Sequence, residues 1–485
     1  MRDFTNILSH EQAENLGDQI EYIREDLDND NVEPEVLSLH IIGPDQAKIK
    51  LWCAVHFSEK NGLIICEFEV EKDEMFPLEP VENPLDAPED TLRSNPTEAE
   101  IAESTHSISK PLRALRHARG DAAAISVYNM TSQIQDQLAN TSNLDQLLKV
   151  TVGFVKELTK FHRVMIYQFD ESFNGKVVTE LVDLKASNDL FKGLHFPASD
   201  IPPQARELYK INKIRLLYDR ELPTARLVCR TQKDLDNPLD MTHSYLRAMS
   251  PIHLKYLKNM GVRASMSLSI TAFGELWGLV SCHAYGRRGM RVSFPTRKMC
   301  RLIGEAVARN VERLSYANKL HARRLISTVS TDQVPAGYIV ASSDDLLKIF
   351  DADFGLLSIG DETKELGNMI ASQEALALLE YLRIKRFTSV TPSQHISIDF
   401  VDLNFTQGFG VIGGLLVVPL NINGSDFIVF FRKWQLRQVN WAGNPHEKHN
   451  QSESHSPLEP RKSFKVWSET VAGKSSEWTS EQSEF

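Results

Sequence analysis

The stretch FPASDIPPQARELYK, residues 196–210, sets one acid, Asp200, between an apolar run and two prolines. Asp is a favoured residue at a helix N-cap, and Pro is accepted in the first helical turn, where backbone N–H groups lack partners within the helix. The pattern therefore predicts a helix that starts close to Asp200 and continues through Gln204, Ala205 and Leu208. A capping role is the structural interpretation of Asp200 and a binding role is the alternative; this stretch leaves both open.

The bulk composition narrows the class of protein. The chain has 485 residues, 42% of them hydrophobic and 25% charged, which is typical of a soluble globular protein with about two to four domains. A formal net charge of −11 argues against a protein built to hold nucleic acid or an anionic membrane surface. The sequence has no apolar run of about 20 residues and no basic-then-apolar start, so we expect neither a membrane span nor a signal peptide.

The cysteines are scattered and include no C-x-x-C pair, which offers no zinc site. Their distribution is typical of a reducing compartment, and we expect a cytoplasmic or nuclear protein. The cysteines are Cys53, Cys66, Cys229, Cys282 and Cys300.

The first part of the chain carries a hairpin pattern. Two apolar, alternating runs, KIKLWCAVHF (48–57) and GLIICEFEV (62–70), are parted by a polar turn, which predicts two paired strands. The segment from Glu71 to about Leu115 is acidic and Pro-rich with little periodicity. We expect an exposed connection there.

The central part, from about residue 120 to 315, mixes helical and strand patterns. A helical repeat of apolar residues precedes Phe161, and a long amphipathic helix follows Pro295 and runs past Leu325. Helices of that length bridge domains or pair with a second copy, so a homodimer is expected. Two hairpins are predicted between the helices, one from 163–169 and 176–183, the other from 264–271 and 275–285.

A second mixed region starts at about residue 333 and includes strand-like runs at 414–420 and 426–436. After Asn440 the chain becomes rich in Ser, Glu and His and contains PRKSFKVW (460–467). A polar excursion of that length inside a compact domain is functional or disordered.

Strand alternation assigns side chains to faces. Ser265, Ser267 and Ser269 share one face of their predicted strand, and His283 in the partner strand points away from Cys282. Such a row of serines is either the solvated face of a half-buried sheet or the wall of a polar pocket that His283 would extend.

Other candidate binding residues are weaker when each is taken alone. His253 and Tyr256 lie one helical turn apart, where a structural role for the histidine is the simpler interpretation. Arg215 and Arg247 could clamp carboxylates or could be ordinary surface arginines. No third ligand stands near the histidines at a metal-binding spacing, so no metal site is expected. No nucleophile motif, P-loop or dinucleotide-binding motif occurs, and we do not expect this chain to be an enzyme.

Taken in order, five motifs resemble the photosensory half of a phytochrome. The resemblance covers residues 45 to 470, is most specific between Arg163 and Gly286, and is greatest for fungal and bacterial types. It implies an α+β fold made of tandem domains, each an antiparallel sheet with flanking helices, linked by a long helix. The motifs are FPASDIPPQARELYKINKIRLL, LRAMSPIHLKYLKNMGVRASMSLSI, LWGLVSCHAYG, NWAGNP and PRKSF.

The resemblance implies a domain layout and a cofactor. A partial PAS-like domain would occupy residues 1–75, a linker 76–118, a GAF domain 119–315, and a PHY domain 316–485 with a tongue at about 433–471. The GAF domain would bind a linear tetrapyrrole, biliverdin, and the module would sense red and far-red light. The implied bilin-binding residues are Tyr167, Phe196, Asp200, Ile201, Pro202, Tyr209, Arg215, Arg247, Ser250, His253, Tyr256, Ser265, Ser267 and His283.

Within this set, the resemblance gives Asp200 a second role. Its carboxylate would pair with Arg461 of the tongue, assisted by Ser463, and light would break the contact and let the tongue refold. Trp434 and Trp467 would exchange places in that step. A capping role for Asp200 is compatible with the switch role.

The chain departs from the family pattern at the covalent anchor. Ile252 stands where plant-type and cyanobacterial phytochromes carry the attachment cysteine, and the N-terminal cysteine of bacterial and fungal members has no match. We therefore expect noncovalent binding to a chain shortened at both ends, without the N-terminal knot. The full-length protein is expected to be a sensor histidine kinase whose output module lies outside this chain.

A second function remains open at this point. The GAF pattern would also fit a regulatory or dimerisation module that binds another small ligand or none, because this fold hosts several ligands. The set Asp200, Arg215, His253, His283 and Arg461 distinguishes the two, since a nucleotide pocket would not require it.

Overall fold

The computed structural model describes residues 4–25, 34–42, 48–73, 76, 78, 92, 95–112, 122–229, 231–327, 343–403, 408–446, 459–478 and 480–483. The chain divides into two compact units. The first consists of Met1–Val311 with Asn440–Trp467, and the second of Glu312–Val439 with Ser468–Phe485. We describe each unit by itself.

The N-terminal part of the first unit is a three-stranded antiparallel sheet with the order β1-β2-β3. The strands are β1 (Glu35–Ile42), β2 (Lys48–Ser58) and β3 (Leu63–Val70), preceded by a 3-10 turn, η1 (Phe4–Ile7), and helix α1 (His10–Glu25). Leu16 of α1 is buried in one core with Leu39, Cys53 and Val55. The apolar alternation of β2 and β3 thus places one face of this sheet against α1.

A sheet that the structure describes with eight strands has the order β16-β15-β6-β5-β4-β9-β8-β7, and its strands from β6 to β7 form the centre of the first unit. The two strands at one edge, β15 and β16, come from far along the chain and extend it beyond the short strand β6. The bounds are β4 (Arg163–Phe169), β5 (Gly175–Val182), β6 (His195–Phe196), β7 (Ile214–Leu217), β8 (Ala264–Ala272), β9 (Glu275–Ala284), β15 (Gln435–Ala442) and β16 (Val466–Lys474).

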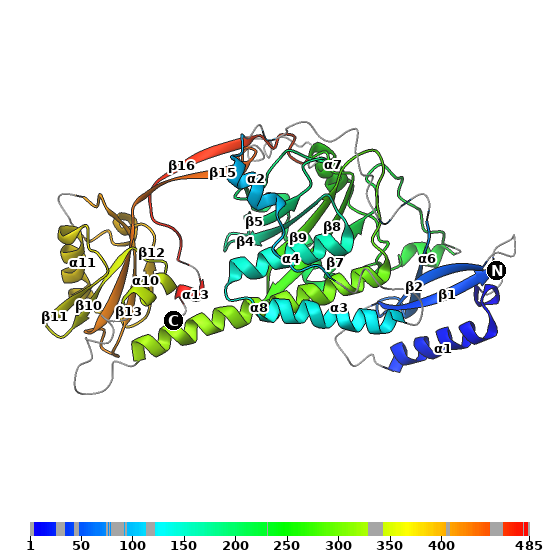
Figure 1. The fold of residues 1–485 in the computed structure, drawn as a ribbon, viewed down its shortest axis with the longest axis horizontal. Helices are drawn as coiled ribbons and strands as arrows, with labels where there is room; N and C mark the ends of the chain where they lie inside the picture. The colour runs from blue at the N-terminus through cyan, green and yellow to red at the C-terminus, as the bar shows by residue number, and fades with distance from the viewer. Residues whose placement is uncertain are drawn as a thin grey trace. The chain divides into compact units, whose positions relative to one another are not determined.

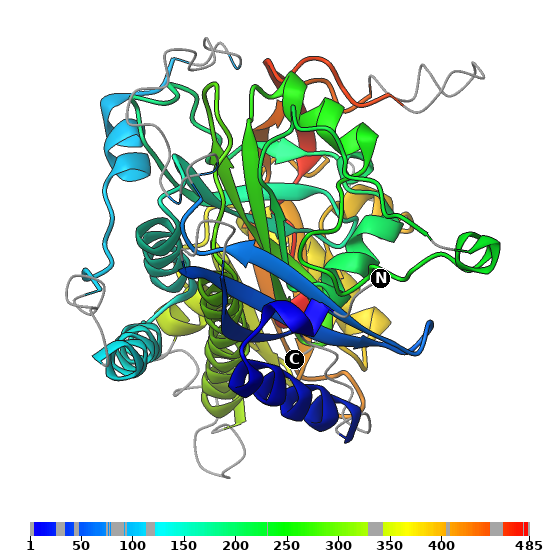
Figure 2. The same cartoon turned by 90° about the vertical axis from the view of Figure 1, so that its right-hand side faces the viewer.

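Helices cover one face of this sheet. Figure 2 shows α3 (Ala122–Ala139), α4 (Leu144–Thr159) and α8 (Phe294–Ser327) nearly end-on and on the same side of the strands. Gly304 lets α8 approach β8 closely, because a Cβ there would lie 3.1 Å from the carbonyl oxygen of Ser269 and 3.2 Å from the Leu268 side chain. Leu268 therefore faces α8, and the serines of β8 face the opposite side.

The opposite face carries the shorter helices α5 (Pro203–Ile211) and α7 (Pro251–Asn259), together with the 3-10 turn η3 (Ala198–Asp200). A further short helix, α6 (Gln232–Asp236), lies in an exposed segment between β7 and α7. In Figure 1, α7 lies at the end of β8 and β9.

The segment from Glu71 to about Leu115, where the sequence predicts an exposed connection, is mostly exposed where the structure describes it, but part of it is helical. It contains helix α2 (Glu98–Thr105), which starts with a capping box between Thr97 and Glu100. Ser104 of this helix is buried and donates a hydrogen bond to Glu180 of β5. A single small residue makes this contact, so the helix lacks the apolar stripe by which a sequence pattern is recognised.

The second unit is built on an antiparallel sheet with the order β11-β10-β14-β13-β12. Its strands are β10 (Phe354–Ile359), β11 (Glu362–Leu366), β12 (Thr391–Ser393), β13 (Ile412–Pro419) and β14 (Phe427–Lys433), and its helices are α10 (Ser343–Ile349), α11 (Ser372–Lys385), α12 (Ile396–Asp399) and α13 (Ser480–Ser483). The α+β class predicted from the sequence is confirmed for both units. Among the described residues, no helix combines the length and apolar character that crossing a membrane requires.

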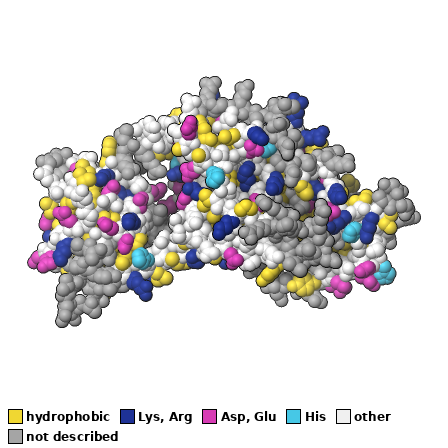
Figure 3. All heavy atoms as spheres, in the orientation of Figure 1, with side chains coloured by type: hydrophobic (Ala, Val, Ile, Leu, Met, Phe, Trp, Pro, Cys, Tyr) yellow, Lys and Arg dark blue, Asp and Glu magenta, His cyan; other side chains and the backbone are white. Residues whose placement is uncertain are grey.

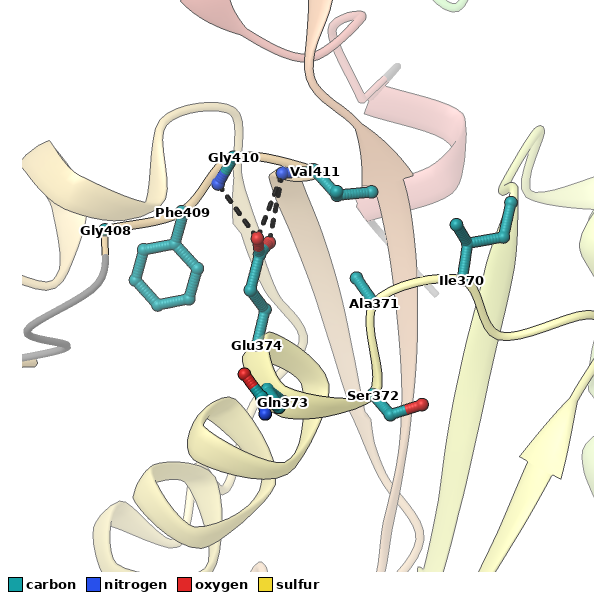
Figure 4. Close-up of a pocket in the computed structure, with 9 residues that line it drawn as sticks. All are labelled: Ile370, Ala371, Ser372, Gln373, Glu374, Gly408, Phe409, Gly410 and Val411. Atoms are coloured by element: carbon teal, nitrogen blue, oxygen red, sulfur yellow. Dashed lines mark hydrogen bonds between the residues drawn. The ribbon is translucent and has the colours of Figure 1, made fainter.

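A cavity of about 590 Å³ lies in the second unit between the start of α11 and residues 408–411 (Figure 4). Glu374 points from the first turn of α11 at the loop, where its carboxylate accepts hydrogen bonds from the N–H groups of Gly410, Val411 and Ile412. The carboxylate fills a concave group of backbone donors of the kind that binds anions. We interpret this feature as a structural clamp between α11 and β13.

Basic and acidic side chains lie interspersed on the face drawn in Figure 3, so neither sign covers it continuously.

Candidate functional site

The register of β8 and β9 brings the predicted serines and histidine together. Ser265 lies opposite His283, and Ser267 lies opposite Ser281. Ser265, Ser269 and His283 are buried, so this is not the solvated face of a half-buried sheet. The serine row is instead an inner wall beneath α5 and α7.

Arg215 enters this wall from β7, where it pairs with Ser267. Its Nη2 donates to the carbonyl oxygens of Arg247 and Ala248, while Nη1 is buried without a hydrogen-bond partner among the described residues. Burial, and then the nearby charge of Arg247, lower the pKa of Arg215 to about 10. A buried guanidinium group with a nitrogen that lacks a hydrogen-bond partner is energetically unfavourable. A bound anionic group would supply the missing acceptor.

Arg247 supplies a second positive charge at the same place. It is half-buried, and its Nη1 donates to the carbonyl oxygen of Thr242 at 3.3 Å. The hydroxyl of Tyr209 lies 3.5 Å from Ser267, while Ser250 is exposed at the N-cap of α7. Two arginines and several hydroxyls therefore gather where a ligand with carboxylates could bind.

The two histidines lie deep in the protein. Burial is the main cause that lowers the pKa of His253 to about 4 and that of His283 to about 3, and neighbouring positive charge adds to both shifts. Nδ1 of His283 has no hydrogen-bond partner among the described residues. His253 keeps some accessible surface although burial strongly disfavours its charged form.

Aromatic residues close the same region. Tyr167 and Phe196 are buried with ring centroids 5.7 Å apart, and Ile201 and Tyr256 pack against the same core cluster. A Cβ on Gly175 would lie 1.7 Å from the Tyr167 ring, so only glycine leaves room for that ring. Tyr256 stacks on His253 at 6.1 Å. The predicted aromatic residues thus form a single apolar wall.

The cap interpretation of Asp200 is wrong. Helix α5 begins at Pro203, and its N-cap, Pro202, makes no side-chain hydrogen bond. Asp200 instead ends the turn η3, and its carboxylate accepts hydrogen bonds from Arg461 and from the Tyr256 hydroxyl, the latter at 3.2 Å. The prolines alone start the helix, because their missing N–H groups need no cap.

Asp200 and Arg461 form a bidentate ion pair. Arg461 Nε lies 3.0 Å from Oδ1, Nη2 donates to Oδ2, and both side chains are almost fully buried. Burial acts to lower the pKa of Arg461, but the charge and hydrogen bonds of Asp200 outweigh it and raise the pKa. The two residues are 261 positions apart in the chain. The segment around Arg461 is thereby fixed to the turn that precedes α5.

Further contacts surround the ion pair. Nη1 of Arg461 donates to the carbonyl oxygen of Ala442, and Asn259 donates to the carbonyl oxygen of Arg461 at 2.8 Å. Phe464 is buried against the edge of Tyr256, with ring centroids 5.3 Å apart. The hydroxyl of Ser463 accepts a hydrogen bond from the N–H of Lys465 at 3.5 Å, and among the described residues it makes none with Asp200.

The two tryptophans of the predicted exchange belong to different units. Trp467 lies in the first unit with its ring 5.9 Å from that of His446, and Trp434 lies in the second unit, where it is partly exposed. Their exchange stays a prediction.

Sequence reasoning missed a buried network beneath the aromatic wall. Arg163 is fully buried; it pairs with Glu180 at 2.6 Å and donates to the hydroxyls of Tyr285 and Ser187. Its positive charge also contributes to the lowered pKa of His283. The sequence feature that could have indicated this network is the charged residue Arg163 at the start of the apolar run RVMIYQF. A buried charge needs a partner, but the sequence does not say which one.

The site fits a linear tetrapyrrole that carries two carboxylates. The unused Nη1 of Arg215 and the unpartnered Nδ1 of His283 are buried donors or acceptors that such a group would satisfy. Cys282 is buried behind His283 on the α8 side of the sheet, Cys300 is buried in α8, and Cys53 and Cys66 lie in the N-terminal sheet. Ile252 occupies the second position of α7 and is exposed.

Two family models match the chain. The GAF domain model matches residues 143–313, and the model of the phytochrome region matches residues 318–485. Together they span the candidate site and the segment that carries Arg461.

Curated relatives are similar over about three quarters of the chain. The phytochrome-like protein Cph1 of Synechocystis sp. is 31% identical over 73% of this chain and 48% of its own length. A bacteriophytochrome of Xanthomonas campestris is 31% identical over 67% of this chain and 53% of its own length. The chain thus spans about half the length of the curated relatives it matches.

Solved structures agree with the fold. The photosensory core module of the Stigmatella aurantiaca phytochrome has a TM-score of 0.66 and is 26% identical, with 99% of this chain and 85% of that chain covered. A bacteriophytochrome of R. palustris has a TM-score of 0.67 with the same coverage at 24% identity, which concerns the fold alone.

Proposed function

The chain belongs to the phytochrome family as a photosensory module, and from that premise we propose that it binds biliverdin noncovalently in its GAF domain and uses the bound pigment to sense red and far-red light. The observation that carries the proposal is the buried guanidinium of Arg215, whose Nη1 has no hydrogen-bond partner among the described residues. A second arginine and a row of serine hydroxyls lie next to it. A bilin supplies red absorbance and a rotating end ring when it is bound.

The chain's own residues would divide the work of holding the pigment. Arg215 and Arg247, with Ser250, Ser265 and Ser267, would hold the two propionates, and Tyr209 would support that side of the wall. His253, which stays neutral at physiological pH, and the main chain of Asp200 would face the pyrrole nitrogens. His283 would bind the end-ring carbonyl, and the remaining residues would surround that ring: Tyr167, Phe196, Ile201, Pro202 and Tyr256.

The ion pair of Asp200 with Arg461 would transmit the signal. Both groups are buried, so breaking their contact leaves two charges that need new partners, and the tongue has to move to provide them. A small movement of Tyr256, which touches both the pigment wall and Asp200, is then enough to bias a larger refolding. Trp434, Ser463 and Trp467 would take part on the tongue side.

The proposal extends to partners and to the layout of the chain. A partial PAS domain at residues 1–75 would precede the GAF domain at 119–315, and residues 316–485 would form the PHY domain. Tyr316 and Leu320 of α8 are exposed apolar residues one turn apart, which favours a homodimer through this helix. In the full-length protein the output would be a histidine kinase, in the cytoplasm or nucleus.

A binding titration tests the proposal. Purified chain titrated with biliverdin should develop a red absorbance band that saturates at one pigment per chain, and SDS should release the pigment because no cysteine anchors it. Arg215→Gln should lower the affinity by about tenfold or more, since a hydrogen bond to a charged group contributes about 1.5–3 kcal/mol. Arg226→Gln, at an exposed arginine, is the matched control. Weak binding unaffected by Arg215→Gln, or a zinc-fluorescent band that survives SDS, would contradict the proposal.

A further inference from the structure

Helix α7 contacts both sides of the switch. His253 and Leu257 point from it toward the candidate bilin site and its core. Lys255 and Asn259, one turn apart, instead reach residues 459–464 of the tongue. Lys255 Nζ lies 2.9 Å from Glu459, and Asn259 Nδ2 lies 2.8 Å from the carbonyl oxygen of Arg461.

These two tongue contacts are not equivalent. Lys255 is largely exposed and Glu459 is partly exposed, and ion pairs at the surface stabilise a protein little. Asn259 is half-buried and donates to the main chain, at the residue whose side chain makes the switch contact. A bond to the backbone constrains where the residue lies and therefore where its side chain can reach.

The position of Arg461 along the tongue matters because its neighbours cannot replace it. The carbonyl oxygen of Arg461 accepts a hydrogen bond from Asn259. Its Nη1 donates to the carbonyl oxygen of Ala442, and its Nε and Nη2 donate to Asp200. Lys462 is exposed. A slip of one residue in an extended segment exchanges inward and outward side chains, and would present an ammonium to Asp200 in place of the bidentate guanidinium.

We propose that Asn259 is a positioning residue of the light switch: its amide holds the backbone of Arg461 in the one register in which the guanidinium can meet Asp200. The inference rests on the proposed function, because the register matters for signalling only if the ion pair is the switch. The clamp itself belongs to the chain without pigment and can be measured there.

Hydrogen exchange of the full chain without bilin tests the clamp. Asn259→Asp keeps the size of the side chain, removes the donor and turns an oxygen toward the carbonyl of Arg461. It should speed exchange in peptides covering residues 459–467 by about three- to tenfold, the range expected for one neutral hydrogen bond, and leave β8 and β9 unchanged. Lys258→Ala, at an exposed position of the same helix, is the control and should change neither region.

A second variant pair separates positioning from general support. If Asn259 acts through Arg461, then Asn259→Asp should have a clearly smaller effect on tongue exchange in an Arg461→Ala background than in the wild type. Equal effects in the two backgrounds would overturn the proposal. So would unchanged tongue exchange, or faster exchange shared by β8 and β9, which would make Asn259 a structural residue of α7.

The hydrogen-exchange result can be distinguished from the result of the biliverdin titration. If the wild-type chain binds no biliverdin, the sensor function fails while the exchange experiment still decides the clamp. If biliverdin binds, Asn259→Asp should keep the dark absorbance maximum, because the pocket side of α7 is untouched. A shifted maximum would place Asn259 in the pocket wall and contradict the positioning role.

Discussion

At the scale of single residues, the site is organised by charges that the protein buries. Asp200 and Arg461 neutralise each other. Arg215, in contrast, has a buried Nη1 group without a hydrogen-bond partner among the residues that the structure describes, and it lies next to a second arginine, Arg247. The first arrangement is complete without a ligand and the second is not. The ion pair therefore suits a switch that opens, and the arginine pair suits a binding site that fills.

Replacing Arg461 tests the switch contact. Arg461→Ala leaves the buried Asp200 carboxylate with the hydrogen bond from the Tyr256 hydroxyl, so the candidate site loses its charge-assisted link to residue 461. We expect the bilin-loaded variant to keep a red band but to fail to form the full photoproduct. The measurement is the amplitude of the red-light difference spectrum, with Lys462→Ala as the exposed control. A wild-type amplitude in Arg461→Ala would remove the ion pair from the signalling path.

The histidines predict how stability depends on pH. Their folded-state pKa values, about 4 for His253 and about 3 for His283, lie below the ordinary value of 6.5, so the unfolded chain binds more protons between these limits. Stability should therefore fall as the pH drops from about 7 to 5, with about 2 kcal/mol lost per histidine. Urea unfolding of the pigment-free chain measures the slope. His253→Gln with His283→Gln should reduce the slope, while burial of His56, whose pKa is also lowered to about 4, keeps part of it. An unchanged slope would argue that the rings of His253 and His283 are already protonated or solvated when folded.

At the scale of elements, local pattern predicted the hairpins and the long helix but missed pairings that are remote in sequence. Strands β4, β5, β8 and β9 lie where the two predicted hairpins placed them, and α8 lies where its apolar stripe predicted a long helix. The sequence near Trp441 in β15 and His195 in β6 gives no indication that these residues pair. A single bridge between remote segments does not alter the hydrophobic periodicity of either segment. Helix α3 was also missed; its apolar residues are interrupted by a polar run, TSQIQDQ.

Glu374 offers a prediction at the level of elements. Its carboxylate joins the first turn of α11 to the start of β13 through three backbone N–H groups, so Glu374→Ala should lower the unfolding free energy of the second unit by about 2 kcal/mol. Urea unfolding followed by the fluorescence of buried Trp478 would report this loss. Gln373→Ala, at the exposed neighbouring position, is the control. Equal stability of the two variants would mean that water replaces the carboxylate.

At the scale of the whole molecule, the sequence led to the right fold class and to a coherent set of site residues through a resemblance rather than through local chemistry. Nothing local in the sequence joins Asp200 to Arg461 across 261 positions; the order of motifs suggested it. The roles of Arg163 and Asn259 escaped because each depends on a partner that only the folded chain supplies. Sequence pattern reveals which residues are unusual, and tertiary structure decides their partners.

The homodimer is a prediction at this scale. Leu320 is 65% exposed on α8, and an exposed leucine on a long helix is stabilised by a second copy. Leu320→Glu should shift the chain from dimer to monomer in sedimentation velocity at micromolar concentration, whereas Arg309→Glu, at an exposed position of the same helix, separates the loss of apolar contact from the added negative charge. A monomeric wild-type chain would contradict the proposed interface.

The most direct test of the central claim is the absorbance spectrum of the biliverdin-loaded chain in the dark and after red light. A red band that decreases on illumination, with a new far-red band that reverts, is the predicted result and would identify a working noncovalent photosensor. A red band that red light leaves unchanged would show that the chain holds the pigment without switching. The absence of any band would contradict the assignment of the arginine and serine wall to bilin binding.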